Sequence, residues 1–187
     1  MGHSVGRNDR AFTVDPIGPH RKGRYGAHAV TNLDTNGARS HCVYDPGYVE
    51  IRRALKIPVV GFGQSAFHVA VQIAPQFGLI APNDSLAKSA YNVLDQYGLR
   101  DRLVYIDSLN IELPDAHKRQ DELRSRSIGI ARAAKEHGAG VVIPFGLALV
   151  PTHVSTEDIR VGAGVPVLNP AEIGIRQAEV IMKAMQG

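Results

Sequence analysis

The only cysteine of the chain, Cys42, stands three residues before Asp45, which opens an Asp-Pro-Gly turn. A thiol can transfer protons, and the positive end of a helix dipole favours its thiolate form. Because an Asp-Pro-Gly turn is typical of a helix start, Cys42 is the first candidate for chemistry, and His41 or Asp45 could influence its protonation. The alternative is that Cys42 is a small buried apolar residue, as lone cysteines usually are.

A second candidate is the glycine-rich segment 61–66 (GFGQSA), which follows an apolar run. Glycines at such a turn let backbone N–H groups approach an anion at the start of a helix. The pattern fits a dinucleotide-binding turn, with Asp84 about 20 residues further on as the acid for a ribose. It equally fits a tight turn with close helix packing, and Asp84 lies beyond Pro82, where a helix cap is also expected.

The third candidate is the segment 141–147 (VVIPFGL), which belongs to a faint internal repeat. In the first copy CVYDPG (42–47) precedes IPVV (57–60), and in the second copy this segment precedes VPVL (165–168). This faint repeat predicts two similar lobes with a ligand cleft between the ends of their strands. The competing explanation is that all strand–turn–helix units look alike. Phe145 and Gly146 cannot transfer a proton. His153 follows within ten residues as a candidate acid or base, or as a solvated loop residue.

Apolar runs and helical patterns alternate along the chain after residue 41. Continuous apolar runs suit strands that are covered on both faces of a parallel sheet. Helices are expected over 84–97, 118–137 and about 171–185. The pattern predicts an α/β fold of two similar doubly wound lobes with mainly parallel sheets. The expected strands lie within 57–62, 77–81, 102–107, 140–144 and 164–169.

Composition bounds the organisation of the chain and the classes of function. The 187 residues, 44% hydrophobic and 21% charged, suffice for one domain or two small lobes. We expect a basic leader over 1–40, a first lobe from 41–76 plus 170–187, and a second lobe from 77–169. No run reaches the roughly 18 apolar residues of a membrane helix, no secretory signal is evident, and no nucleic-acid motif occurs. A lone cysteine provides neither a disulfide nor a metal site, which favours a cytoplasmic protein.

Together these segments resemble the Asp/Glu/hydantoin racemase superfamily, most closely its hydantoin racemase branch. The resemblance runs from about Cys42 to the C-terminus, and it explains the glycine-rich turn without a dinucleotide. It implies two α/β lobes around a substrate, with no organic or metal cofactor, and here a first lobe shortened at its N-terminus. It depends on four segments in order: CVYDPG (42–47), IPVVGFGQSAFH (57–68), FGLIA (77–81) and GVPVLNP (164–170).

The resemblance also implies a reaction. Two cysteines, one in each lobe, remove a proton from carbon next to a carbonyl or carboxylate and return it from the opposite face. Cys42 matches the first-lobe base, whereas the second cysteine, expected near Phe145 or Gly146, is missing, and His153 is the candidate replacement. The expected substrate-binding residues are Val43, Asp45, Gly63, Gln64, Ser65, Asn83, Phe145, Gly146 and Leu147.

Four functions follow from these observations. The first is a cofactor-independent racemase or isomerase that moves a proton on a hydantoin-like or amino-acid-like substrate. The second is a one-cysteine decarboxylase of malonate-like acids, in which loss of CO₂ generates the carbanion. The third is a non-catalytic, degenerate member that binds a small ligand, and the fourth is a dinucleotide-binding protein that uses the 61–66 turn. The expected partners are a small carboxylate or hydantoin-like substrate and further copies of the chain.

Overall fold

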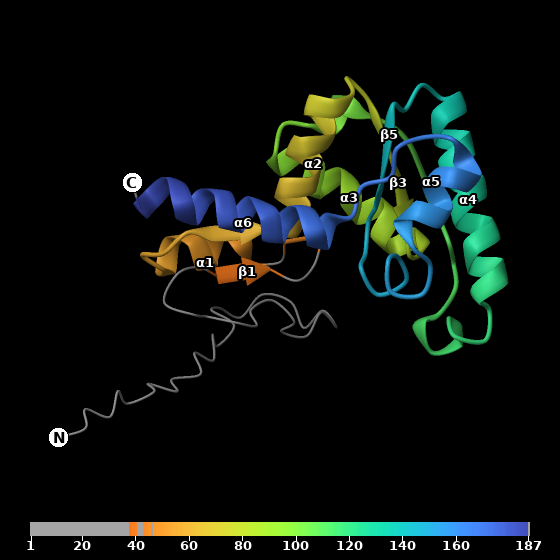
Figure 1. The fold of residues 1–187 in the computed structure, drawn as a ribbon, viewed down its shortest axis with the longest axis horizontal. Coiled ribbons are helices and arrows are strands. Elements are labelled where there is room, and N and C mark those ends of the chain that lie inside the picture. The colour runs from red at the N-terminus through yellow and green to blue at the C-terminus, as the bar shows by residue number, and fades with distance from the viewer. Residues whose placement is uncertain (1–37, 41–42, 46, 187) are drawn as a thin grey trace.

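Two parallel sheets form the centre of the protein. The computed structural model describes residues 38–40, 43–45 and 47–186 (Figure 1). β1 (Ala38–Ser40) pairs with β2 (Val59–Gly61) in the first sheet. The second sheet has the order β4 (Leu103–Ser108), β3 (Phe77–Ala81), β5 (Val141–Pro144). Every strand pair in the described part of the chain is parallel, as the continuous apolar runs predict.

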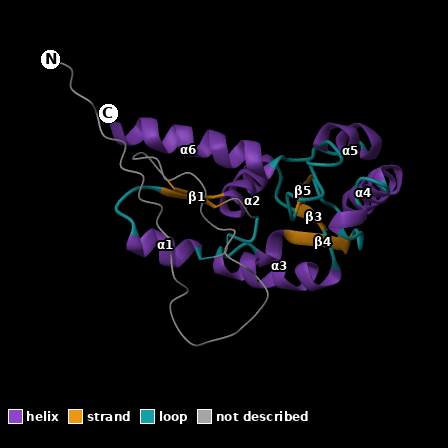
Figure 2. Cartoon of the chain, turned by 90° about the horizontal axis from the view of Figure 1, so that it is seen from below, coloured by secondary structure: helices purple, strands orange, loops and turns teal. Residues whose placement is uncertain are grey.

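Helices cover both sheets, with α6 on one side of the first sheet and α1 on the other (Figure 2). Polar side chains fix two of the helix starts: Asn83 accepts the Leu86 N–H at 3.0 Å, and Ser155 accepts the Asp158 N–H at 3.0 Å. None of the described helices is long and apolar enough to span a membrane. The helices are α1 (Tyr48–Ala54), α2 (Phe62–Ile73), α3 (Asp84–Gln96), α4 (Gln120–Glu136), α5 (Thr156–Ala163) and α6 (Pro170–Gln186), with short 3₁₀ turns at Arg100–Arg102 and Leu113–Asp115.

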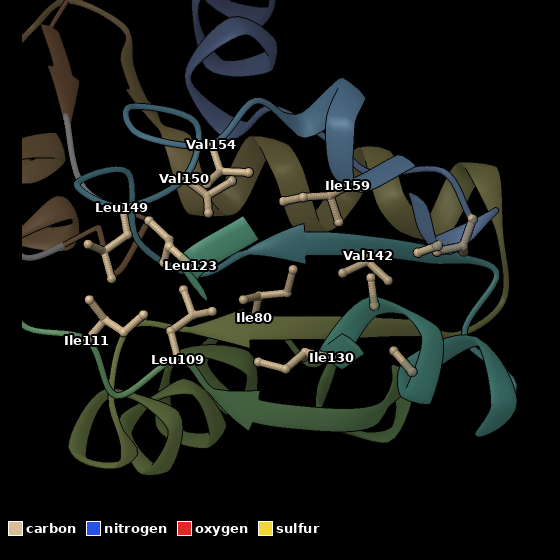
Figure 3. Packing of buried hydrophobic residues seen from close by; sticks show 14 of the residues in the cluster. Ile80, Leu109, Ile111, Leu123, Ile130, Val142, Leu149, Val150, Val154 and Ile159 are labelled. Carbon is tan, nitrogen blue, oxygen red and sulfur yellow. The ribbon is translucent and has the colours of Figure 1, made fainter. Parts of the chain in front are cut away.

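The second sheet has an apolar core on each face. Because side chains alternate along a strand, Leu79 and Ile143 point to the face covered by α2 and α3. Their neighbours Ile80 and Val142 point to the opposite face. There they pack with Leu123 and Ile130 of α4 and Ile159 of α5 (Figure 3). Burial on both faces explains why these strands read as unbroken apolar runs.

Helix α2 packs on the second sheet although it directly follows a strand of the first. Its Phe67 is fully buried, with ring centroids 5.9 Å from Phe77 of β3 and 6.1 Å from Phe145 after β5. On its other side α2 lies against α6. The two sheets therefore share a core through α2. The lobe boundaries expected near residues 76 and 170 stay a prediction.

The α/β fold with parallel sheets is confirmed, and three differences in detail have physical reasons. The run 164–169 forms a single bridge, Val142 with Val167, because Asn169 caps α6 two residues later and ends the extended chain. Helix α5 was not expected, since it is short and its apolar residues are few. Ala38–Ser40, placed in the expected leader, form β1, where pairing needs only backbone groups. The rest of that leader and the proposed shortening of the first lobe lie outside the described residues.

Candidate functional site

The turn Val43–Asp45 is fixed at the start of α2 by the Asp45 carboxylate. This carboxylate accepts the N–H of Gly63 at 3.2 Å and the N–H of Gln64 at 2.6 Å. It also accepts the hydroxyl of Tyr97, at the end of α3, at 2.9 Å. Asp45 is only 5% exposed and has a φ of 46°, a left-handed conformation that aspartate tolerates better than most residues. A buried side chain of the chain itself thus closes the N-terminus of α2.

The glycines of the 61–66 turn are explained by the close approach of this segment. A Cβ atom on Gly63 would lie 2.0 Å from the Val43 carbonyl oxygen, and one on Gly61 would lie 2.6 Å from the Asp45 carboxylate. Only glycine allows this contact. The N–H groups that a dinucleotide phosphate would need already bind Asp45. Asp84, the expected ribose ligand, instead accepts the Asn110 amide at 3.0 Å beside the start of α3.

Burial dominates the electrostatics of Asp45. It raises the pKa of this carboxyl to about 6, although the N–H groups of Gln64, Gly63 and Phe62 and the Tyr97 hydroxyl act in the opposite direction. Burial and the neighbouring Asp45 charge raise the pKa of Tyr97 above its ordinary value. Tyr97 is therefore a neutral donor, and Asp45 changes its charge in a pH range that enzymes commonly encounter.

Tyr44 connects the same turn to the end of β5. Its hydroxyl donates to the Phe145 carbonyl oxygen at 3.1 Å, and the two rings pack edge to face with centroids 4.4 Å apart. The Phe145 N–H donates to the Ile80 carbonyl at 2.8 Å, and its ring is fully buried. The carboxyl ends of β3 and β5 and the segment after Cys42 consequently meet at one corner. Such an edge is where α/β proteins bind ligands.

Gly146 completes this corner and leaves no room for a side chain. Its φ is 148°, and an added Cβ would lie 2.6 Å from Cγ of Pro82. Phe145 uses its side chain, its N–H and its carbonyl in packing and hydrogen bonds. The position expected for a second cysteine thus holds an aromatic core residue and a strained glycine. Neither can donate a proton.

The other expected site residues divide between this corner and structural roles. Ser65 is buried in the first turn of α2, and the Gln64 amide oxygen accepts the Tyr48 hydroxyl. Asn83 caps α3. Leu147 is half-buried beside the α2–α3 core, and its carbonyl accepts the Thr152 hydroxyl at 2.7 Å. Their proposed contacts with substrate stay predictions.

His153 lies further from the corner along the chain. The segment that carries it packs through Leu149, Val150 and Val154 on the face of the second sheet that α4 covers, opposite the α2–α3 side (Figure 3). The backbone N–H of His153 donates to the Leu149 carbonyl at 2.9 Å. Among the described residues no hydrogen bond of its ring occurs. Cys42 and His41 lie outside the described residues, and Cys42 is peptide-bonded to the fixed residue Val43.

A polar depression of about 640 Å³ opens beside the Asp45 contact. Its wall includes Tyr44, Tyr48 and Tyr97, which are not among the predicted site residues. Tyr97 is the last residue of the helix predicted over 84–97, and its hydroxyl contact with Asp45, 52 residues away in sequence, has no local signal. In the described part of the chain, no group of three or more His, Cys, Asp or Glu side chains could hold a metal ion.

Known structures with the same arrangement are racemases and a decarboxylase. Allantoin racemase from Klebsiella pneumoniae aligns with a TM-score of 0.69 at 22% identity, over 80% of this chain and 60% of that chain. Allantoin racemase from Pseudomonas fluorescens aligns with 0.72 at 17%, over 82% and 65%. Arylmalonate decarboxylase aligns with 0.55 at 14%, over 75% and 62%. At these identities the likeness establishes the fold, which is that of the two-lobed racemases.

Sequence comparison identifies the family. The family described as Asp/Glu/Hydantoin racemase matches residues 22–178, and the chain belongs to this family. Hydantoin racemases from Paenarthrobacter aurescens and Rhizobium meliloti are each 26% identical to the chain, over 144 and 146 residues. These alignments cover 75% and 76% of the chain. The chain spans 59% and 58% of the length of these relatives, and the family match begins inside the segment expected to be a leader.

Proposed function

We propose that the chain is a racemase- or isomerase-type enzyme that needs no organic or metal cofactor. Its substrate is a small hydantoin-like or amino-acid-like molecule, and the reaction moves a proton at the carbon next to a carbonyl or carboxylate. The family and the two curated hydantoin racemases support this class of reaction. The observation that carries the proposal is the fixed turn Val43–Asp45, which follows Cys42 and meets the strand ends of the second sheet through Tyr44 and Phe145.

In the proposed reaction the Cys42 thiolate takes the proton from the α-carbon. The electron pair of that C–H bond moves into the carbonyl group, and the negative charge collects on oxygen. Hydrogen-bond donors that are already oriented stabilise such a charge better than mobile water does. The reaction ends when a proton returns to the carbon. In a two-cysteine enzyme the cysteine of the second lobe would deliver this proton from the opposite face. Phe145 and Gly146, which stand at that position here, have no group that can do so.

The missing second thiol favours one further candidate, a decarboxylase of malonate-like acids. Here the bond between the α-carbon and one carboxylate breaks, CO₂ leaves, and the electron pair remains on the α-carbon as an enolate. The Cys42 thiol then gives its proton to that carbon and regains one from solvent. A single acid suffices for this reaction, and arylmalonate decarboxylase shares the fold. A cytoplasmic location and a homo-oligomeric state are further parts of the proposal.

Proton exchange in D₂O tests the proposal directly. The chain and its Cys42→Ser variant are incubated with 5-substituted hydantoins, α-amino acids and substituted malonates, and the α-proton signal and the optical rotation are followed. We expect exchange that falls at least about 100-fold in the variant, because a positioned acid–base group contributes roughly that much or more. A His153→Gln variant tests whether the imidazole of His153 returns the proton to the α-carbon.

Each outcome assigns a mechanism or removes one. Exchange with retained configuration indicates that Cys42 acts on one face alone. Racemisation that is lost in His153→Gln identifies His153 as the second acid, and racemisation that survives it points to water. Release of CO₂ from malonates supports the decarboxylase. If no compound exchanges or loses CO₂, or if Cys42→Ser is as active as the native chain, the proposed function is wrong and a ligand-binding role takes its place.

A further inference from the structure

Three elements that are distant in sequence converge on one buried carboxylate. The backbone of α2 supplies the N–H groups of Gly63 and Gln64, and the end of α3 supplies the Tyr97 hydroxyl. The residue that receives these hydrogen bonds, Asp45, lies in the turn that begins one residue after Cys42. Each donor is itself fixed: the two N–H groups belong to a helix, and the Tyr97 ring packs against Phe67 with centroids 6.2 Å apart.

The backbone leaves this carboxylate little freedom. Asp45 has a φ of 46°, and the glycines at 61 and 63 have no Cβ atoms, which would overlap the turn. A buried charge costs free energy unless it is well paired, so a carboxylate here is expensive compared with an apolar residue that would fill the same space. Residues that cost stability in this way commonly serve a site.

We propose that Asp45 is a positioning residue for Cys42: its carboxylate clamps the turn after the thiol onto the first turn of α2 and onto Tyr97. This inference rests on the proposed function of Cys42 as the proton-transfer residue. The clamp sets where the chain leaves Val43, and therefore where the preceding residue is attached. Asp45 itself performs no chemistry in this scheme.

The clamp responds to pH because an ionised carboxyl costs more free energy to bury than a protonated one. Burial raises the pKa of Asp45 to about 6, so the buried geometry favours the protonated carboxyl and the clamp weakens as the pH rises through that value. The titratable groups near it are Tyr97 at the end of α3 and Tyr48 on α1, and Arg52 interacts with both tyrosines. Glu50, also on α1, lines the same depression. His68 of α2 packs against Tyr97 with centroids 5.9 Å apart and is the other group to control.

The reactivity of the single thiol reads out the clamp without any substrate. Because Cys42 is the only cysteine of the chain, iodoacetamide labelling at each pH from 5 to 8 reports on it alone. The rate is divided by the rate of the urea-unfolded chain, which removes the ordinary titration of a thiol. We expect this ratio to change at least about threefold between pH 5 and 7.5, with a midpoint near 6, because Asp45 loses its proton over this range.

Four variants separate Asp45 from its neighbours. Asp45→Asn has no carboxyl to titrate and should give a ratio that is flat with pH. Tyr97→Phe removes a donor that lowers the pKa of Asp45 and should move the midpoint to higher pH. Glu50→Gln removes an exposed carboxylate of the same depression, and His68→Gln removes the nearby imidazole. Both should leave the midpoint unchanged.

The outcomes separate this inference from the proposed function. A midpoint near 6 that Asp45→Asn abolishes and Tyr97→Phe raises supports the clamp, even if no substrate of the panel reacts. A native ratio that is flat with pH, or a midpoint that persists in Asp45→Asn, overturns it, even if Cys42 proves catalytic. Loss of the midpoint in His68→Gln would assign the effect to the imidazole and also overturn it. Thermal melting of each variant confirms that the labelled protein is folded.

Discussion

At the scale of single residues, several contacts hold the backbone in place at the corner where the ends of β3 and β5 meet the turn Val43–Asp45. Tyr44, Phe145 and Gly146 are joined by a side-chain hydrogen bond, an aromatic contact and a close approach to Pro82. The backbone of Gly146 adopts a conformation that residues other than glycine rarely adopt. A second thiol therefore cannot be restored by exchanging one residue for another at this position.

Substitution of Gly146 by cysteine tests this conclusion. We expect Gly146→Cys to lower the free energy of unfolding by about 2 kcal/mol or more, from backbone strain and overlap with Pro82, and to give no gain in racemisation. Ala148→Cys is the control, because Ala148 is exposed in the same loop and accepts the thiol without strain. Urea unfolding and a racemisation assay are the measurements. A Gly146→Cys chain that melts like the native protein and racemises faster would contradict the described geometry.

Single residues also mark the limit of prediction from sequence at the site. The turn at Asp45 and the helix start near Gly63 and Gln64 were predicted from their motifs, since both follow local rules, whereas the binding of substrate by these residues stays a prediction. The use of Asp45 was not predicted, because whether a carboxylate faces substrate or the chain's own N–H groups depends on packing between distant segments. Tyr97 was missed for the same reason: its ring follows the helical stripe and only its hydroxyl reaches the site.

At the scale of elements, α6 and α2 pack with unusually little space between them. A Cβ atom on Gly174 of α6 would lie 2.1 Å from the Phe62 ring at the start of α2, and Phe62 is only 2% exposed. Phe62 precedes Gly63, which donates to Asp45. The distance between these two helices therefore influences the placement of the clamp.

Two glycine-to-alanine substitutions separate packing from helix propensity. Gly174→Ala gains helix propensity but overlaps Phe62, and we expect a net loss of about 1–3 kcal/mol in the free energy of unfolding. Gly129→Ala, within α4, meets no atom within 4 Å and should gain up to about 1 kcal/mol. Chemical denaturation of both variants provides the comparison. Equal stabilisation by the two changes would show that α6 and α2 are not in tight contact.

Element positions were predicted well where the apolar pattern was long. The expected helices at 84–97 and 118–137 correspond to α3 and α4 within two residues at each end. The run 164–169 has the composition of a strand, yet Pro166 cannot donate a hydrogen bond and Asn169 caps α6, so only Val167 pairs. The sequence pattern gives the apolar residues, whereas the length of a strand depends on what its neighbours leave room for.

At the scale of the whole molecule, pH acts on stability through carboxyl groups whose pKa values are shifted in opposite directions. The pKa of Asp45 is raised from 3.8 to about 6 by burial, so the native chain keeps a proton that the unfolded chain loses between these values. Its contribution to stability is therefore greatest below pH 4 and decreases as the pH rises to 6. Glu122 and Glu157, paired with Arg119 and Arg160, have lowered pKa values and act in the opposite sense.

The difference between native and Asp45→Asn proteins isolates the buried carboxyl. Relative to the variant, we expect the native free energy of unfolding to decrease by up to about 3 kcal/mol between pH 4 and 6.5, since each unit of pKa shift corresponds to about 1.4 kcal/mol. Urea unfolding of both proteins at several pH values measures this. The exposed ion pairs are present in both and cancel. Parallel pH profiles would show that Asp45 is not desolvated in solution.

The position of α6 in the chain also sets an order of assembly during synthesis. All three strands of the second sheet, together with α3 and α4, lie in the continuous stretch 77–144, so they leave the ribosome one after another. The partner that covers β2 and the outer side of α2 is synthesised only after this stretch is complete. Until α6 has been synthesised, the faces of β2 and α2 that it covers in the folded protein therefore stay exposed, while all strands of the second sheet are already present.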